Sequence, residues 1–447
     1  MEKKLALIFI ICAVLILVLN LLNCSYLPLR SGYSTEMREL DRQSFDLIWN
    51  TINDKHYDPE FGGLDWQGVY NELEPRLKIA KSHSQARDIM WDMITRLELS
   101  HFNIIPAEVS SEIELDHDAE NKTGIVGLDV RVIDGQALVT DVFAGYPAHQ
   151  AGVKQGWEIL KINHKETSEK IAGITKEFAG KSVQRYVLAS VFKSKLSGVP
   201  GHSVNVHFLD ENEKTVEKTL TFVPEKGEKH KFGYMPPFLV KVKVDTLENN
   251  IGYFSFNAFI DPLTIMTAFN NAIKSFMNLN GVIIDVRGNG GGMGEIGLGI
   301  AGWFINEKGV KFGTVYFRDN HINLVTNPRA KIFDGPVVIL TDGLSASAAE
   351  LFSGGMQDCG RACIVGTPTA GAALPSTIVK CPNGDVFQYA FANYISASGK
   401  RLEGKGVIPD IKVNHTRDAL LRGRDNAEIA AIKWIRQQNK PEKTVTN

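Results

Sequence analysis

The sequence lacks the residues on which several protein classes depend. Five cysteines among 447 residues exclude a dense disulfide framework. Cys359 and Cys363 have the spacing C-x-x-x-C and no H-E-x-x-H motif occurs, so neither a structural zinc site nor a thioredoxin-like redox site is indicated. Lysine and arginine (49) do not outnumber aspartate and glutamate (51), which leaves no positive excess for binding phosphates. We therefore expect no metal, no cofactor and no nucleic-acid partner.

The composition that remains is that of a globular protein of several domains. Hydrophobic residues make up 44% and charged residues 22% of the chain, which excludes a disordered protein. At roughly 100–200 residues per domain, the length predicts two to four domains.

The first 24 residues differ from the rest of the chain. Lys3 and Lys4 precede an apolar run from Leu5 to Leu19. A helix over positions 5–22 spans roughly 27 Å, enough for a thin hydrocarbon core. Residues 1–24 are thus predicted to be a signal peptide or an N-terminal membrane anchor, and Cys24 is a candidate for lipid attachment. All three readings place the body outside the cytoplasm, in a periplasm or at the cell surface.

Two regions follow before the C-terminal half. Residues 36–105 carry apolar side chains at helical spacing, as at Phe45, Ile48 and Trp49, and predict a helical N-terminal region. Residues 122–224 contain short runs of high strand propensity, with Asp134-Gly135 as a hairpin turn, and predict a β domain.

The β domain resembles a PDZ domain of the bacterial protease type. The resemblance rests on the GIVGL loop at 124–128, the segment PAHQAG and the segment GWEILKIN. It implies that the loop presents its N–H groups to a peptide C-terminal carboxylate, while the peptide adds a strand to the sheet edge. The implied peptide-binding residues are Gly124, Ile125, Val126, Gly127 and Leu128.

Residues 235–436 predict an α/β core. Short apolar runs such as Gly281–Val286 and Pro336–Leu340 are typical of buried parallel strands, and helical stretches alternate with them. The glycines after Asp285, in DVRGNGGG, allow the backbone to approach a ligand closely. A G-x-G-x-x-G pattern begins at Gly292, but it stands too far from the strand and lacks the acidic residue that a dinucleotide site needs. An oxyanion hole is the better use of these N–H groups.

A second small-residue turn, SASAAE at 345–350, follows the strand that ends near Thr341. Such a turn exposes a serine at a helix N-terminus, where free N–H groups stabilise developing negative charge. A serine there is otherwise a helix cap. It is not the G-x-S-x-G elbow of α/β-hydrolases, because Ser347 occupies the last glycine position.

The sequence resembles the tail-specific, C-terminal-processing serine peptidase family, which includes the tricorn core. The motifs that carry this resemblance are DVRGNGGG, SASAAE, MQDCGRACIVGTPTAG and GKGVIPDI. The resemblance covers about residues 40–436. It implies a multidomain α/β protein with a crotonase- or ClpP-like α/β-spiral core and the inserted PDZ-like domain. It also implies that Ser347 is the nucleophile, with oxyanion donors from Ala348 and from Gly290, Gly291 or Gly292.

One position departs from the processing-peptidase branch, in which a lysine is the general base. Ala372 stands where that lysine would be. The tricorn-like branch uses histidine, serine and glutamate instead, and these resemble Ser100-His101 in LELSHFNII and Glu403 in LEGKGVIPD. The resemblance thus implies that His101 is the base, with a pKa near the ordinary 6.5, that Glu403 orients the far ring nitrogen, and that Ser100 is a polar neighbour. Lys380 and Lys400 are the alternative bases.

Two functions follow from these residues. One is an exported serine endopeptidase that binds unfolded or C-terminal peptide segments and cleaves them through an acyl-enzyme. The other is a degenerate member of the same fold that holds peptides or apolar ligands without cleaving them. Ala372 favours the second, whereas the set Ser347, His101 and Glu403 favours the first.

Overall fold

The computed structural model describes residues 33–107, 124–227, 229–230 and 238–439. The segment 1–24, with Cys24, lies outside these residues, so its predicted role stays a prediction. Across the described ranges, no helix is both long and apolar enough to cross a bilayer.

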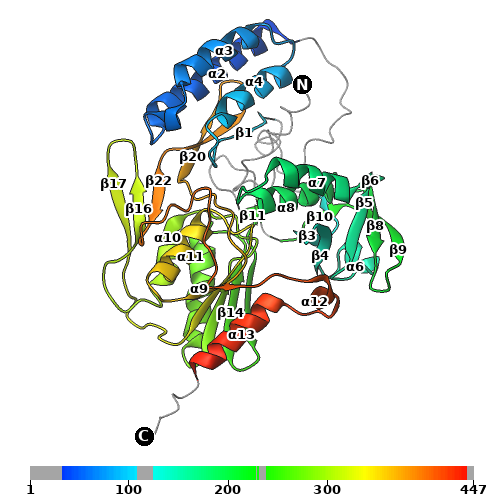
Figure 1. Ribbon diagram of the computed structural model, residues 1–447, viewed down its shortest axis with the longest axis vertical. Helices are drawn as coiled ribbons and strands as arrows, with labels where there is room; N and C mark the ends of the chain where they lie inside the picture. The colour runs from blue at the N-terminus through cyan, green and yellow to red at the C-terminus, as the bar shows by residue number, and fades with distance from the viewer. Residues whose placement is uncertain (1–32, 108–123, 228, 231–237, 440–447) are drawn as a thin grey trace, which may run out of the picture.

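The N-terminal region consists of three helices, drawn in blue in Figure 1: α2 (Thr35–Lys55), α3 (Trp66–Lys78) and α4 (His83–Thr95). Each begins at a side-chain cap, since Ser34, Asp65 and Ser82 accept hydrogen bonds from backbone N–H groups of the first turn. The helices bury the face predicted from spacing, including Phe45 and Ile48. A short 3-10 turn, η3 (Phe61–Gly63), separates α2 from α3.

The end of this region is a strand rather than a helix. Strand β1 (Asn103–Ile105) pairs with β21 (Val386–Ala390), which also pairs with β20 (Ser376–Lys380). The helical region predicted to reach residue 105 therefore ends earlier, because residues 103–105 complete a sheet by pairing with a strand more than 280 residues away. This pairing brings the segment around residue 101 to the core.

The inserted domain is a β-rich unit with three helices. Its main sheet has the order β3-β4-β5-β8-β9, with β6 at the side of β5. The strands and helices are β3 (Leu128–Ile133), β4 (Gln136–Val142), α6 (Pro147–Gln150), β5 (Glu158–Ile162), β6 (Lys165–Glu166), α7 (Thr167–Glu177), α8 (Gln184–Lys195), β8 (Ser203–Leu209) and β9 (Thr215–Thr221). Asp134 and Gly135 form the predicted two-residue hairpin, and both have positive φ, as the tight turn between β3 and β4 requires.

The predicted carboxylate loop is partly used inside this domain. Gly124 and Ile125 form β2, the central strand of a small sheet between β7 (Ser197–Gly198) and β10 (Val223–Pro224). The Val126 N–H donates to the Leu196 carbonyl at 3.4 Å. The prediction that residues 124–126 bind a peptide carboxylate is therefore wrong, because their backbone is already paired. Gly127 and Leu128, at the start of the edge strand β3, remain as candidates.

The core is a six-stranded sheet with the order β13-β14-β15-β18-β19-β23. Only the β13–β14 pair is antiparallel. The strands are β13 (Val242–Leu247), β14 (Ile251–Phe256), β15 (Gly281–Asp285), β18 (Val337–Thr341), β19 (Cys363–Gly366) and β23 (Ile411–Lys412). Every residue of β15, β18 and β19 is buried, as expected for parallel strands covered on both faces.

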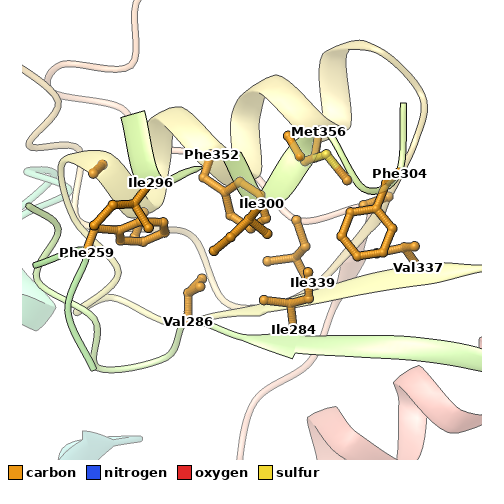
Figure 2. Close-up of a cluster of buried hydrophobic side chains, with 14 of the residues drawn as sticks. Phe259, Ile284, Val286, Ile296, Ile300, Phe304, Val337, Ile339, Phe352 and Met356 are labelled. Carbon is orange, nitrogen blue, oxygen red and sulfur yellow. The ribbon is translucent and has the colours of Figure 1, made fainter. Parts of the chain in front are cut away.

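Helices cover both faces of this sheet. On one face lie α9 (Pro262–Phe276), α10 (Gly294–Ala301) and α11 (Ala348–Asp358); on the other lies α13 (Asn426–Gln438). Figure 2 shows the first layer, in which Phe352 and Met356 of α11 lie over Ile284 and Ile339 of the strands. Burial of each such side chain contributes about 1.5–3 kcal/mol, which fixes α11 on the sheet.

The remaining elements surround the core. They are β11 (Lys229–His230) paired with β12 (Phe238–Leu239), the sheet β17 (His321–Thr326), β16 (Val310–Tyr316) and β22 (Asn393–Ser396), and the short helix α12 (Arg417–Leu421). In Figure 1 the β16–β17 hairpin projects from the side of the molecule.

Candidate active site

Ser347 stands at the turn between β18 and α11. It is the N-cap residue of α11, with φ 53° and ψ −119°, a conformation that a side-chain-bearing residue rarely adopts. Such strain persists only where the surrounding structure over-determines it, and it concentrates at functional sites. The side chain is half-buried. The predicted serine therefore lies at the start of a helix, where free N–H groups favour negative charge.

Asp342 holds this turn to the glycine-rich loop. Its carboxylate accepts hydrogen bonds from the N–H groups of Gly288, Leu344 and Ser345, at 2.9, 3.0 and 3.1 Å. Burial raises the pKa of Asp342, but Arg131 of the inserted domain and these donors outweigh burial and hold the pKa below its ordinary value. Asp342 therefore stays ionised and fixes the loop against the turn.

The glycine loop supplies fewer oxyanion donors than predicted. Gly291 lies against Ser347, since a Cβ atom on Gly291 would stand 2.6 Å from the Cβ atom of Ser347. However, its N–H donates to Asn289 Oδ1 at 2.9 Å. The assignment of Gly291 as an oxyanion donor is thus wrong, because that N–H is already bonded. The N–H groups of Gly290, Gly292 and Ala348 have no hydrogen-bond partner among the described residues.

Asn289 is a site residue that the sequence analysis missed. It is fully buried; its Nδ2 donates to the Phe256 carbonyl at 2.9 Å, and its own carbonyl accepts from the Ala346 N–H at 3.0 Å. It therefore connects the glycine loop, β14 and the residue before Ser347. An asparagine among glycines is typical of turns, so the sequence alone gives no signal for this role.

Ser100, His101 and Glu403 form one hydrogen-bonded chain. The Ser100 hydroxyl lies 2.7 Å from His101 Nδ1 and 2.9 Å from Glu403 Oε2. The Ser100 N–H donates to Glu403 Oε1 at 2.8 Å, and the Ala373 N–H donates to Oε2 at 2.9 Å. Glu403 is therefore connected to the histidine ring through the Ser100 hydroxyl and not by a direct hydrogen bond. The expectation that Ser100 is only a polar neighbour is wrong.

This chain fixes the tautomer of His101. Burial raises the pKa of Glu403, whereas the Ser100 and Ala373 donors lower it. With Glu403 ionised, the carboxylate only accepts, so the Ser100 hydroxyl donates its one proton to it. It must then accept from His101 Nδ1–H, which leaves Nε2 as the unprotonated nitrogen. That Nε2 is buried and has no hydrogen-bond partner in the described part of the chain. Within the described residues the Nε2 lone pair of His101 is therefore free, and no hydrogen bond joins it to Ser347.

Burial determines the charge state of His101. The ring is 1% exposed, and burial lowers its pKa to about 4. The expected pKa near 6.5 is therefore wrong, because burial of the ring disfavours the charged imidazolium. His101 also has a positive φ of 63°, so it is strained like Ser347.

The lysines considered as alternative bases lie outside this arrangement. Lys400 is exposed, and its Nζ pairs with Asp358 at 3.3 Å. Lys380, the last residue of β20, is exposed as well. Ala372, where the family lysine would stand, is fully buried; its carbonyl accepts the Ser347 N–H at 2.8 Å. Within the described residues, no cluster of three or more histidine, cysteine or acidic side chains could hold a metal ion.

Two parts of the chain match known protein families, and the chain is similar to known processing proteases. Residues 38–95 match the family model of the Tricorn protease C1 domain, and residues 250–413 match that of Peptidase family S41. The chain is 26% identical over 381 residues to "Carboxyl-terminal-processing peptidase 3, chloroplastic" of Arabidopsis thaliana, covering 81% of this chain and 67% of that protein. It is 23% identical over 289 residues to "Carboxy-terminal processing protease CtpA" of Bacillus subtilis (strain 168), covering 64% and 55%.

The fold is similar to that of a solved processing protease. The structure titled "Photosystem II D1 C-terminal processing protease" aligns with a TM-score of 0.56 at 19% identity, covering 88% of this chain and 99% of that one. The chain spans only between about half and two thirds of the length of the two curated relatives. It nevertheless carries a Tricorn protease C1 domain followed by a serine-type peptidase domain of family S41.

Proposed function

We propose that this protein is a serine endopeptidase with a Ser-His-Glu site that acts on unfolded or C-terminal peptide segments. The observation that carries the proposal is the chain from Glu403 through Ser100 to His101 Nδ1, which leaves Nε2 free as a base. The same backbone segment connects this chain to the nucleophile, because Ala373 bonds Glu403 while Ala372 bonds the Ser347 N–H.

In the proposed reaction His101 acts first as a base and then as an acid, in each of two steps. His101 Nε2 takes the hydroxyl proton of Ser347 as the oxygen attacks the scissile carbonyl carbon. The N–H groups of Ala348 and of Gly290 or Gly292 stabilise the resulting oxyanion. The imidazolium then gives its proton to the leaving amine, which yields an acyl-enzyme. Water, deprotonated by the same nitrogen, then attacks the ester. The imidazolium returns this proton to the Ser347 oxygen as the acyl C–O bond breaks, which releases the acid and restores the serine.

The neutral resting state of His101 suits this role. A base must be unprotonated before attack, and a pKa lowered to about 4 keeps the ring neutral at physiological pH. The imidazolium formed during attack is stabilised through Ser100 by the Glu403 carboxylate. Ala372 is thus compatible with catalysis, since the site has a base without a lysine.

Active-site labelling tests the proposal. A fluorophosphonate probe should label the purified full-length chain at Ser347, and neither Ser347→Ala nor His101→Ala should be labelled. Ser353→Ala is the matched control: this serine lies on α11, where its hydroxyl bonds the Ala349 carbonyl, and its variant should be labelled like wild type. A wild-type chain that folds but takes no label would contradict the proposal. It would favour a peptide-binding protein without activity, the function that Ala372 suggests.

Three further parts of the proposal concern the core, the inserted domain and the location of the protein. The core is proposed to be a crotonase- or ClpP-like spiral, and the inserted domain to be PDZ-like and to add a peptide as a strand at the open edge of β3. Peptides with a free C-terminus should then bind Ser347→Ala more tightly than amidated ones.

Export and membrane attachment rest on Lys3, Lys4 and the apolar run after them. A reporter fused after Asn447 that is active only outside the cytoplasm tests that location.

A further inference from the structure

One buried carboxylate near the nucleophile has no role in the reaction described above. Glu350 is the third residue of α11 and is completely buried. An ionised buried carboxylate is costly unless it is fully hydrogen-bonded. Its partners therefore indicate what it does.

Four donors surround the Glu350 carboxylate. Oε1 accepts from the Thr369 hydroxyl at 2.5 Å and from the Gly371 N–H at 2.8 Å. Oε2 accepts from the Ala372 N–H at 2.8 Å and from the Ser347 N–H at 3.1 Å. These bonds occupy the four acceptor sites of a carboxylate. The bond to Ser347 is the usual reach of a glutamate at this helix position toward the N-cap; the other three lead to the turn at 369–372.

That turn holds both ends of the proposed catalytic chain. The Ala372 carbonyl accepts the Ser347 N–H at 2.8 Å, and the Ala373 N–H donates to Glu403 at 2.9 Å. Glu350 thus contacts the backbone of the nucleophile directly and fixes the turn that positions Glu403. No other carboxylate in the described residues bonds both the Ser347 backbone and this turn.

The geometry points to Glu350 as a positioning residue that, in its ionised form, sets the distance between Ser347 and the chain of Glu403, Ser100 and His101. This inference rests on the proposed function. Three of the four donors are backbone N–H groups, which cannot reverse, so only the ionised carboxylate satisfies all of them. A protonated Glu350 could donate its proton only to the Thr369 hydroxyl oxygen. That oxygen already accepts the Val407 N–H at 2.6 Å.

The charge on Glu350 is sensitive to pH near neutrality. Burial raises its pKa to about 7 despite the Thr369, Gly371 and Ala372 donors, and the neighbouring Glu403 carboxylate raises it further. Protonation of Glu350 and protonation of His101, whose pKa is about 4, therefore fall in separate pH ranges. The two groups can be told apart in one pH profile.

The test is the second-order rate of fluorophosphonate labelling of the full-length chain from pH 3.5 to 9, with folding followed by circular dichroism. In the wild type the rate should rise through a midpoint near 7. Glu350→Gln places an amide N–H₂ against an N–H donor, so the rate should fall by about 100-fold and lose the rise near pH 7. Thr369→Val removes one donor to the ionised form and should move the midpoint to higher pH.

Glu428→Gln is the matched control. Glu428 is also the third residue of a helix, α13, and burial raises its pKa too, but it bonds no part of the site. Its variant should keep the wild-type rate and profile. A folded Glu350→Gln variant with the wild-type rate and profile overturns the inference. If Glu350→Gln does not fold, an unchanged midpoint in Thr369→Val overturns it instead. A wild-type chain that takes no label overturns the proposed function, and the role of Glu350 with it.

Discussion

A single hydroxyl group, that of Ser100, sets which ring nitrogen of His101 carries the proton. It donates to Glu403 and must accept from Nδ1–H, at 2.9 and 2.7 Å. The residues were found from their resemblance to a family, but the order of contacts was not. Which side chain stands between a histidine and a glutamate 302 positions away depends on the tertiary structure alone.

Ser100→Ala should therefore cost about as much as Glu403→Gln, by about 10²–10⁴-fold in turnover. Ser100→Ala removes the acceptor of the Nδ1 proton. Glu403→Gln removes the carboxylate that orients the Ser100 hydroxyl to accept that proton, so both substitutions stop favouring the reactive tautomer. Peptide hydrolysis and probe labelling measure the effect. Ser100→Thr keeps the hydroxyl and should retain most of the activity. If Ser100→Ala works at the wild-type rate, Glu403 does not act through this hydroxyl.

The buried neutral ring of His101 also predicts a pH dependence of stability. The folded-state pKa is about 4, below the ordinary 6.5, so the unfolded chain takes up a proton first as pH falls. Stability from this group is present above pH 6.5 and is lost between 6.5 and 4, by up to about 3 kcal/mol. Urea unfolding at pH 7 and pH 4.5 should show a smaller difference for His101→Gln than for wild type. The exposed His149, changed to Gln, serves as the control and should leave that difference unchanged.

At the scale of elements, the glycine loop lies in close contact with the turn before α11. An alanine at Gly291 would place its Cβ 2.6 Å from the Cβ atom of Ser347 and 2.8 Å from the Ala346 carbonyl oxygen, with φ at 99°. One of the two loops would have to move. We expect Gly291→Ala to lower the labelling rate by about 100-fold.

Gly309→Ala separates this clash from the cost of a positive φ. Gly309 also has a positive φ, of 69°, but a Cβ there would have no neighbour within 4 Å. Its variant should lose about 1–2 kcal/mol of stability and keep the wild-type labelling rate. Equal labelling rates in the two variants would mean that the loop contact does not position Ser347.

Local sequence patterns predicted the elements around the site, but they did not predict which distant segments pair with each other. The apolar run Gly281–Val286 predicted β15, and the small-residue turn before Ser347 predicted the start of α11. An apolar run and a capping residue are both local features of the sequence. The residues of β1 were predicted to end a helical region, because their partner β21 lies far away in the chain. Glu350 stands three residues after Ser347, a recognisable capping pattern, but its donors at 369–372 are tertiary contacts.

At the scale of the whole molecule, the site depends on how the N-terminal helices dock onto the core. His101 follows α4, and its position is set by this docking and by β1. Arg87 of α4 donates to Asp385 at 2.8 and 3.0 Å, in the turn between β20 and β21. Asp385 is 1% exposed and also accepts the Ala107 N–H at 2.8 Å. In Figure 1 the blue helices lie over this hairpin.

Arg87→Leu should accordingly weaken both stability and activity. It leaves a buried carboxylate without its cation, which costs about 3–5 kcal/mol. We expect faster proteolysis of the α2–α4 region and a lower labelling rate of Ser347, because His101 loses its fixed position. Limited proteolysis and probe labelling of the same samples measure both effects.

Arg42→Leu gives the comparison that makes this result specific. Arg42 pairs with Glu39 and Asp46 on the exposed face of α2, at 2.6 and 2.8 Å. Exposed pairs contribute about 0–1 kcal/mol, so this variant should resist proteolysis and be labelled like wild type. If Arg87→Leu loosens the helices but leaves the labelling rate unchanged, β1 alone holds His101 in place. The pairing of Asn103–Ile105 with β21, rather than the docking of the helices, would then position the base.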